Sequence, residues 1–369
     1  MRILHINCNY IGTTLHQLMV EKLDALGYEN QVYVPTYDEG TAVITPNANG
    51  CVSECFNKWD RLVFDYKQFK IIKDIEKRFD VSSFDCIHAY TLFTDGNCAM
   101  ELSRKYGIPY VVAVRNTDVN AFFAKMIYLR GRGVQVMQEA HKVFFLSEAY
   151  RRQVFEKYVP QKCRAELTAK VQVIPNGIDD FWFKNVPSSN IEERTDETIR
   201  LIYAGRIDKN KNIPTIQAAM AILREKGICS KLTVVGKVDE ADEFERISKD
   251  AHTNCLKPVP KEELMKIYRQ NDIFVMPSFT ESFGLVYAEA MSQGLPVLYS
   301  EGQGFDGQFP EGEVGFHVQA SSPRNVAAMI LQVYQQKDRM SHQNPAHARK
   351  FSWDGIVEHY SKIYGELKE

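Results

Sequence analysis

The sequence predicts an α/β protein built from two doubly wound parallel sheets in tandem. Short runs rich in β-branched residues alternate with helical patterns from residue 2 onward, as in parallel sheets. The alternation stops in a polar stretch at 185–198 and restarts at Ile199, and 369 residues are enough for two cores. Two such domains form a cleft at the carboxyl ends of both sheets, where open α/β sheets bind ligands.

Each predicted element rests on its own run of residues. The predicted strands are 2–8, 31–35, 85–89, 110–114 and 142–146 in the first half, then 199–204, 231–235, 273–276 and 296–299 in the second. The predicted helices are 14–26, 214–226, 262–269, 285–293 and 324–335, with further helical segments between the strands of the first half. From Phe351 onward, Trp353, Ile356, Val357, Tyr360, Ile363 and Tyr364 recur at helical spacing, which predicts a final helix with one packing face.

Composition excludes several classes of protein. A formal net charge of -2 argues against nucleic-acid binding. Of eight cysteines only Cys51 and Cys55 stand close together, without histidines at ligand spacing, so reduced thiols are favoured over a zinc site. No apolar run approaches the ~20 residues of a membrane span, and the N-terminus lacks the features of a signal peptide. We therefore expect a soluble protein of the cytoplasm.

The segment ESFGLVYAE holds two carboxylates, Glu281 and Glu289, around a Ser-Phe-Gly turn. The apolar run 273–276 before it predicts a buried strand, and the residues after the turn predict a helix. Glu289 falls in a mostly apolar part of that helix, where a carboxylate without a partner is costly. Strand, polar loop and helix start together predict an anion site.

A cationic loop opens the second domain. The residues AGRIDKNKN place Arg206 and Lys211 just past a predicted strand, and Gly205 allows a ligand to approach the backbone closely. Two cations at a strand end suit a diphosphate. For this segment alone a solvated loop is an equally good interpretation. The Glu281 to Glu289 segment in the same domain favours ligand binding.

Together, the spacing of these two segments suits a site for a nucleotide sugar. The N–H groups of Phe283, Gly284 and Leu285, with neighbouring Ser282, are predicted to hold phosphate oxygens at the helix start. Glu289 would then lie ~8 Å along the helix, about the distance from a diphosphate to the ribose diol, and its carboxylate accepts from two hydroxyls. Glu281 is predicted to reach hydroxyls on the group that the diphosphate carries.

At this point the chain resembles the family-four glycosyltransferases of the GT-B architecture over essentially its whole length. The E-x7-E segment from Glu281, the GR-x4-K segment from Gly205, the linker PNGID at 175–179 and FSW at 351–353 carry the resemblance. It implies two Rossmann-like domains facing a central cleft, with 1–178 on the acceptor side, 179–349 on the donor side, and a helix over 350–369 that crosses back to the first domain.

The resemblance also implies an activity. Family members transfer a sugar with retention from a nucleotide diphosphate donor, here UDP- or GDP-linked, without a metal or a cofactor. Residues matching Arg206 and Lys211 hold the diphosphate, the one matching Glu289 holds the ribose, and the one matching Glu281 contacts the donor sugar. With Arg115, three of these, Glu281, Arg206 and Lys211, form the expected catalytic set.

The first domain gives weaker signals. The family has a Gly-rich turn after the first strand, but here only Gly12 remains, followed by Thr13 and Thr14. Gly12 is the donor-binding candidate of this turn and the two threonines are acceptor-side candidates, while a plain threonine N-cap is an equal alternative. His88 ends a predicted strand and is a further acceptor-side candidate, although a lone histidine there is more often structural.

Arg115 departs from the family pattern. Many relatives carry a histidine at this strand end, and an arginine cannot take a proton from an acceptor hydroxyl at neutral pH. Either Asp118 or His16 is the base, or the departing phosphate oxygen accepts the proton on the same face, which we favour. Arg115 would then neutralise the leaving diphosphate or bind an anionic acceptor.

Two other segments have competing interpretations. The residues from Gly302 to Gly307 fit G-x-G-x-x-G, but Phe309 and Pro310 follow instead of a helix, which disfavours a nicotinamide site. The family resemblance implies that this loop borders the donor. The stretch 57–79 mixes aromatic and aliphatic residues with lysines and arginines. It is either a helix packed on the sheet with a solvated basic face, which is favoured, or a helix that lies on an anionic membrane.

The sequence therefore predicts a cytoplasmic enzyme that moves a sugar to a hydroxyl of a glycan or lipid-linked saccharide, in cell-surface polysaccharide synthesis, with peripheral contact at the inner face of the plasma membrane as an option. Two rivals remain. A nucleotide-sugar epimerase of the same architecture would convert donor alone, and a non-catalytic sensor would bind donor without turnover. The fold does not separate these, because function depends on the site.

Overall fold

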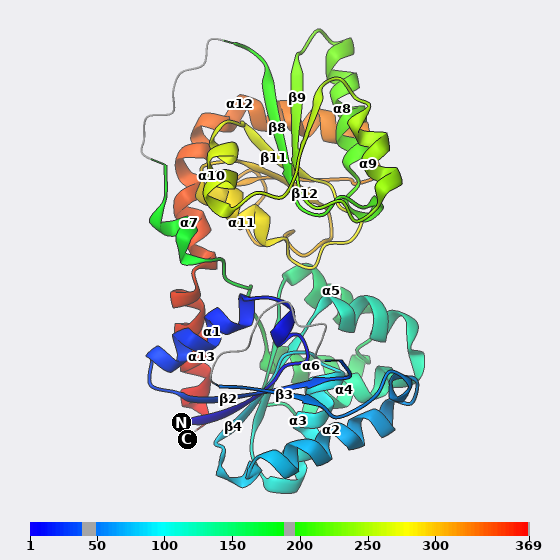
Figure 1. Ribbon diagram of the computed structural model, residues 1–369, viewed down its shortest axis with the longest axis vertical. Coiled ribbons are helices and arrows are strands. Elements are labelled where there is room, and N and C mark those ends of the chain that lie inside the picture. The colour runs from blue at the N-terminus through cyan, green and yellow to red at the C-terminus, as the bar shows by residue number, and fades with distance from the viewer. Residues whose placement is uncertain (39–48, 188–195, 368–369) are drawn as a thin grey trace. The chain divides into compact units, whose positions relative to one another are not determined.

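The computed structural model describes residues 1–38, 49–187 and 196–367, and the chain forms two compact units (Figure 1). Unit 1 comprises Met1–Leu146, Tyr150–Gly177 and Trp353–Glu369, and unit 2 comprises Ser147–Ala149 and Ile178–Ser352. Part of the polar stretch 185–198 lies outside the described residues. Each unit has its own parallel sheet and its own hydrophobic core.

Unit 1 contains a seven-stranded sheet in the order β3-β2-β1-β4-β5-β6-β7. Its strands are β1 (Arg2–Ile6), β2 (Glu29–Thr36), β3 (Gly50–Glu54), β4 (Cys86–Ala89), β5 (Tyr110–Val114), β6 (Lys142–Phe145) and β7 (Val171–Val173). Its helices are α1 (Leu15–Ala25), α2 (Phe64–Arg78), α3 (Thr94–Tyr106), α4 (Arg130–Glu139), α5 (Glu148–Lys157), α6 (Gln161–Lys170) and α13 (Trp353–Glu366). Shorter helical turns are η1 (Tyr10–Gly12), η3 (Trp59–Leu62), η4 (Val81–Ser83), η5 (Asp118–Phe123) and η6 (Ile127–Leu129).

Unit 2 contains a six-stranded parallel sheet in the order β10-β9-β8-β11-β12-β13. Its strands are β8 (Ile199–Ala204), β9 (Ser230–Val235), β10 (Thr253–Leu256), β11 (Ile273–Met276), β12 (Val297–Ser300) and β13 (Gly315–Val318). Its helices are α7 (Asp180–Lys184), α8 (Ile213–Glu225), α9 (Ala241–Ser248), α10 (Lys261–Arg269), α11 (Leu285–Ser292) and α12 (Pro323–Ala348), with the turns η7 (Lys209–Lys211) and η8 (Arg349–Phe351). Helices cover both faces of the sheet (Figure 1).

The structure confirms the fold class, because both sheets are wholly parallel and doubly wound. One helix differs clearly from its prediction: α12, expected over 324–335, continues to Ala348. Pro345 and several polar residues hide this extension in the sequence. It forms because the Asn344 amide is buried and donates to the carbonyls of Leu295 at 2.9 Å and Val314 at 3.1 Å.

The last helix, α13, belongs to unit 1. Trp353, Tyr360 and Tyr364 are buried in a cluster with residues of β1, α1 and β5. Gly177 packs against Trp353, since a Cβ at this glycine would lie 2.5 Å from the indole. The apolar stripe seen in the sequence is therefore a packing face. Within the described part of the chain, no helix is both long and apolar enough to cross a membrane.

Histidines are buried inside unit 1. His5 is fully buried, with Nε2 2.8 Å from Oδ1 of Asn30 and Nδ1 3.1 Å from the hydroxyl of Tyr90. Burial lowers the pKa of His5 to about 4, while the Asn30 hydrogen bond acts in the opposite direction. In the unfolded chain the pKa of a histidine is about 6.5. At pH values between these two pKa values, the unfolded chain therefore binds a proton at His5 that the folded protein does not bind.

We expect the free energy of unfolding to fall as pH drops from about 6.5 to about 4. The unfolded state binds more protons in this window, so stability is complete above it and is lost as pH falls. His5 alone contributes a loss of about 2 kcal/mol between pH 7 and pH 5. Urea denaturation at both pH values measures it. His5→Gln should flatten the pH dependence, and His252→Gln, which changes an exposed histidine, should not. Equal slopes in wild type and His5→Gln would refute the assignment.

Candidate active site

Lys211 and Glu281 form an ion pair at the carboxyl ends of β8 and β11. Nζ of Lys211 lies 2.6 Å from Oε2 of Glu281, and the two side chains are only 13% and 11% exposed. Asn210 ties the two loops together: its amide donates to the carbonyl of Thr280 at 2.8 Å, and its side-chain oxygen accepts from the Thr280 N–H at 3.0 Å. A largely buried, charge-assisted pair is thus held on a fixed loop.

Arg206, by contrast, is an exposed side chain on the same edge of the sheet. Its guanidinium lies 3.2 Å from Asp239 and 3.6 Å from Asp208. Exposed ion pairs contribute little free energy, so the guanidinium can leave these partners for a ligand phosphate at small cost. Gly205 precedes Arg206 and has a φ of 153°. Gly236 packs closely against the Gly205 backbone, since a Cβ on Gly236 would lie 1.7 Å from the Gly205 carbonyl oxygen.

Helix α11 begins with a free N-terminus beside the ion pair. Gly284 has a left-handed φ of 74° and precedes Leu285, and no side chain caps the helix. Within the described residues, the N–H groups of Phe283, Gly284 and Leu285 meet no hydrogen-bond acceptor. The Ser282 N–H donates to Oε1 of Glu281 at 3.0 Å. Free N–H groups at a helix start attract anions, and this helix end meets the requirement set by the sequence.

Glu289 lies farther along α11, where its side chain is partly buried near the Asp179 and Lys261 ion pair. Burial raises the pKa of Glu289 to about 7; the Asp179 carboxylate raises it further and Lys261 lowers it. In the described part of the chain no hydrogen-bond donor contacts the Glu289 carboxylate. The carboxylate is therefore available to accept hydroxyl groups of a ligand.

This raised pKa gives a prediction for nucleotide binding. If the Glu289 carboxylate accepts two ribose hydroxyls, the ligand stabilises its ionised form. UDP binding should therefore release about three-quarters of a proton at pH 6.5 and should tighten as pH rises through about 7. Calorimetry in two buffers of different ionisation enthalpy measures the proton release. The Glu289→Gln variant should lose that release and bind UDP more weakly; identical proton release in both proteins would remove the ribose role.

In unit 1, Arg115 lies at the carboxyl end of β5. Its Nε donates to the carbonyl oxygen of Tyr90 at 3.0 Å and its Nη1 donates to Oδ1 of Asn176 at 2.9 Å. Burial lowers the pKa of Arg115, against the smaller opposing effects of neighbouring tyrosines and of Asp118. Among the described residues no carboxylate forms an ion pair with its guanidinium. A partly buried cation held by neutral oxygens is a candidate anion site.

His16 is buried near Arg115, and its hydrogen bonds define its tautomer. Oδ1 of Asn7 accepts from the Asn9 N–H at 3.0 Å, so the Asn7 amide nitrogen faces Nδ1 of His16 at 2.9 Å and donates to it. Neutral His16 then carries its proton on Nε2, which has no partner within the described residues. Burial and the Arg115 charge lower the pKa of His16. His16 therefore offers a donor at Nε2 and cannot accept a proton there.

Two acceptor-side candidates are engaged in the fold of unit 1. The Asp118 carboxylate is buried and accepts from the N–H groups of Leu92, Phe93 and Arg115 at 3.0, 3.2 and 2.8 Å. His88 is fully buried, lies 2.6 Å from the Tyr364 hydroxyl and stacks on Tyr90. Asp118 therefore fixes the backbone around Arg115 and His88 is a core residue packed against α13, while a role for either on the acceptor side stays a prediction.

The turn after β1 is the remaining prediction in unit 1. Gly12 ends η1 and Thr13 and Thr14 follow it, all three exposed. The Thr14 hydroxyl makes no cap hydrogen bond, whereas the Thr13 hydroxyl accepts from the N–H of Leu15, the first residue of α1, at 3.3 Å. No atom lies within 4 Å of a Cβ placed on Gly12, so this glycine is not required by packing.

Two models of known protein families match the chain. The model of glycosyl transferases group 1 matches residues 187–350, and the model of Glycosyltransferase Family 4 matches residues 13–180. The chain belongs to glycosyltransferase family 4. This family-four glycosyltransferase is 27% identical over 293 residues to the D-inositol 3-phosphate glycosyltransferase of Paenarthrobacter aurescens, covering 73% of the chain and 70% of that relative. It is 30% identical over 221 residues to that of Corynebacterium jeikeium, covering 54% of the chain and 52% of the relative.

Solved structures show the GT-B fold of this glycosyltransferase. Sucrose-phosphate synthase from Thermosynechococcus elongatus superposes with a TM-score of 0.77 at 17% identity, over 100% of this chain and 99% of that one. Anabaena HepE in complex with UDP-glucose superposes with a TM-score of 0.70 at 17% identity, over 99% of this chain and 100% of that one. At such identities the likeness concerns the fold.

The sequence did not single out every residue that shapes the donor-side loops of the glycosyltransferase. Gln303, in the loop that begins at Gly302, accepts from the Glu281 N–H at 2.9 Å, and Gly304 lies so close to the Ser282 carbonyl that a Cβ would meet it at 1.9 Å. Asn210 and Asn212 anchor the other loop, and only their position in a KNKN loop hinted at this. The loop from Gly302 contains turns and no helix, as expected.

One cluster in unit 2 could suggest a metal. Ligand atoms of Asp306, Glu311 and His317 lie within 4.8 Å of one another. Protein partners already account for them: Nδ1 of His317 lies 2.9 Å from Oε1 of Glu311, the Tyr299 hydroxyl donates to that oxygen at 3.0 Å, and the Gly302 N–H donates to Asp306 at 2.6 Å. We assign this cluster no ion.

Proposed function

We propose that this glycosyltransferase moves a sugar with retention, and without a metal, from a UDP- or GDP-linked donor to a hydroxyl of a saccharide or lipid-linked saccharide. One observation carries the proposal: the Lys211 and Glu281 ion pair lies beside the free N–H groups at the start of α11, on the helix that also carries Glu289. Cations, free N–H groups and a carboxylate in this order match a diphosphate followed by a ribose.

The neighbours in the fold favour UDP as the first donor nucleotide to test. HepE of Anabaena was solved with UDP and with UDP-glucose. In our proposal Lys211 and Arg206 neutralise the diphosphate, and Glu289 accepts the ribose hydroxyls. Glu281, freed from part of its contact with Lys211, accepts hydroxyls of the donor sugar.

The chemical step needs no side-chain base. The bond between the anomeric carbon and the phosphate oxygen breaks, the acceptor oxygen bonds to that carbon on the same face, and the acceptor proton moves to the departing phosphate oxygen. Two alternatives weaken on the geometry: the Asp118 carboxylate is occupied by three backbone N–H groups, and Nε2 of His16 already bears a proton. Lys211 stabilises the charge that develops on the leaving group.

We further propose that the acceptor carries an anionic group bound by Arg115 and by Nε2–H of His16. A partly buried guanidinium without a carboxylate partner among the described residues favours a phosphate or carboxylate ligand. The two relatives compared above are named for the phosphate-bearing polyol D-inositol 3-phosphate, which supports this choice. D-inositol 3-phosphate and unmodified inositol are therefore a matched pair of test acceptors.

A thermal-stability screen followed by nucleotide release tests the function. We expect a UDP- or GDP-sugar to raise the melting temperature, and nucleotide release to require an acceptor and to continue in EDTA. Conversion of donor alone into an isomer would establish the epimerase instead. Stabilisation by a donor with no release for any saccharide, phosphorylated or lipid-linked acceptor would favour the sensor.

A further inference from the structure

Exposed large hydrophobic side chains gather on unit 1. Seven of the twelve exposed large hydrophobic side chains in the described part of the chain fall in two short segments of this unit, and we call these seven the docking ridge: Trp59, Leu62, Val63, Tyr66, Phe69, Ile127 and Tyr128. Trp59 is 76% exposed, Leu62 75% and Tyr128 73%. Clustered exposure of this kind marks an interaction site, because isolated exposed hydrophobics are common but contiguous ones are not.

The two segments of the ridge are neighbours in space. The first comprises η3 and the start of α2, and the second is η6. The ring of Phe64, the first residue of α2, lies 6.3 Å from the ring of Phe122, which is one helical turn before Met126 and Ile127. Arg132, after η6, lies 3.7 Å from Asp65. The ridge is therefore one surface assembled from residues about sixty positions apart in the sequence.

Packing inside unit 1 does not explain the ridge. Helix α2 already buries an inner face made of Gln68, Ile71 and Ile75. Tyr66 and Phe69 lie on its outer side and are exposed. Each large apolar side chain left in water forgoes about 1.5–3 kcal/mol that burial would contribute. A partner that covers the ridge would recover part of this free energy.

The charges around the ridge define that partner. Residues 57–78 and 121–132 hold ten Lys and Arg against four Asp and Glu, in a chain whose net charge is -2. Within the described residues no carboxylate pairs with Lys58, Arg61, Lys67 or Lys125. Excess positive charge opposes a second copy of the same surface and favours an anionic one.

We propose that the docking ridge inserts into the interface of a membrane that contains anionic lipids. Tryptophan, tyrosine and leucine side chains settle at the boundary of headgroups and acyl chains, while lysines and arginines meet the lipid phosphates. This binding is peripheral. The proposal deepens the proposed function, because the membrane would be where the acceptor is found. That role of the membrane rests on the proposed function.

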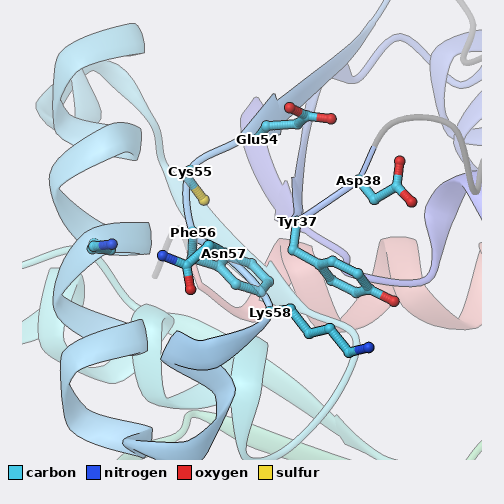
Figure 2. Close-up of a pocket in the computed structure, with 8 residues that line it drawn as sticks. Tyr37, Asp38, Glu54, Cys55, Phe56, Asn57 and Lys58 are labelled. Atoms are coloured by element: carbon cyan, nitrogen blue, oxygen red, sulfur yellow. The ribbon is translucent and has the colours of Figure 1, made fainter.

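A surface hollow adjoins the ridge at the carboxyl ends of β2 and β3. It has a volume of about 510 Å³ and is lined by Tyr37, Asp38, Glu54, Cys55, Phe56, Asn57, Lys58 and Lys70 (Figure 2). Lys58 lies next to Trp59 in the chain, so the hollow opens beside the inserted edge. It is the place where the polar head of a lipid-linked acceptor would meet unit 1.

The fluorescence of Trp59 tests the docking directly. Trp182 and Trp353 are buried, so Trp59 is the tryptophan that a bilayer can reach. We expect vesicles of phosphatidylcholine with phosphatidylglycerol to shift the emission to the blue and to protect it from acrylamide, with loss of both effects at high salt. Phosphatidylcholine alone should do neither. Trp59→Phe should abolish the optical signal while the protein still floats with the anionic vesicles.

Matched variants separate the ridge from general surface effects. Leu62→Ser combined with Tyr128→Ser should lower the vesicle partition coefficient at least on the order of tenfold, and Lys58→Glu with Lys125→Glu should abolish binding. The control substitutions Leu26→Ser and Lys226→Glu, at other exposed positions, should leave binding unchanged. Vesicle binding is measured without donor or acceptor, so its failure is distinct from a failure of sugar transfer.

Two results would overturn the proposal. The first is an unchanged Trp59 spectrum with anionic vesicles, or equal loss of binding in the ridge and control variants. The second is a wild-type dimer in light scattering that the Leu62→Ser and Tyr128→Ser changes dissociate, because the ridge would then cover a second copy of the chain.

Discussion

Replacing Lys211 by alanine is expected to lower kcat/KM by on the order of 10²-fold or more, as the loss of an oxyanion donor does. Lys211 is the largely buried cation beside the free N–H groups of α11, and in the proposed reaction it stabilises charge on the departing diphosphate. The variant also removes one of the partners of the Glu281 carboxylate, which keeps the Ser282 N–H. Steady-state kinetics with saturating acceptor measure the effect.

Lys209 supplies the matched control. It lies in the same turn η7, but its side chain is 72% exposed and reaches Glu240 at 3.7 Å. Lys209→Ala should keep nearly full activity, because an exposed pair contributes little. Lys211→Ala with near-wild-type kinetics, while its melting temperature shows that the protein is folded, would remove Lys211 from the catalytic set.

Replacing Arg115 by alanine should raise the KM for a phosphate-bearing acceptor by on the order of 10²-fold, since a charge-assisted hydrogen bond contributes about 1.5–3 kcal/mol and the guanidinium offers more than one. The KM for the donor should change little. Arg104→Ala, which removes an exposed arginine paired with Glu101 and Glu139, is the control in the same unit. An equal KM for inositol and its phosphate in the wild-type enzyme would contradict an anion site at Arg115.

A second substitution at position 115 tests whether this residue lies near the acceptor proton that is transferred. Arg115 cannot act as a base, whereas a histidine there titrates near neutrality. The pH profile of kcat/KM for Arg115→His should therefore gain a limb near pH 6 to 7. An unchanged profile would count against the placement of residue 115 near the reacting centre.

The sequence predicted the fold well where patterns are strong. The strands over 110–114, 199–204 and 273–276 have the predicted bounds, because apolar runs that are buried almost throughout are typical of the central strands of a parallel sheet. The strands β3, β7, β10 and β13 were not predicted. They are short and, as in β7 and β10, only partly buried, so their pairing is decided by neighbouring strands and not by their own sequence.

Local motifs also predicted contacts within unit 2 better than those within unit 1. A helix start, two cations and two carboxylates were visible as spacings between Gly205 and Glu289, and the structure brings Lys211 and Glu281 together. The acceptor side depends on residues that only the fold assembles. The tautomer of His16 follows from Asn7 and Asn9, and the occupation of Asp118 follows from the backbone of residues 92, 93 and 115. No spacing in the sequence reports such contacts.

The central claim is that the enzyme passes a sugar from a nucleotide donor to an acceptor with retention. Proton NMR of the reaction mixture at early times, with a donor from the stability screen and its acceptor, tests this most directly. We expect nucleotide and product to appear together. We also expect the coupling constant of the new anomeric proton to show the same anomeric configuration as in the donor. A product of inverted configuration, or conversion of the donor with no glycosidic product, would contradict it.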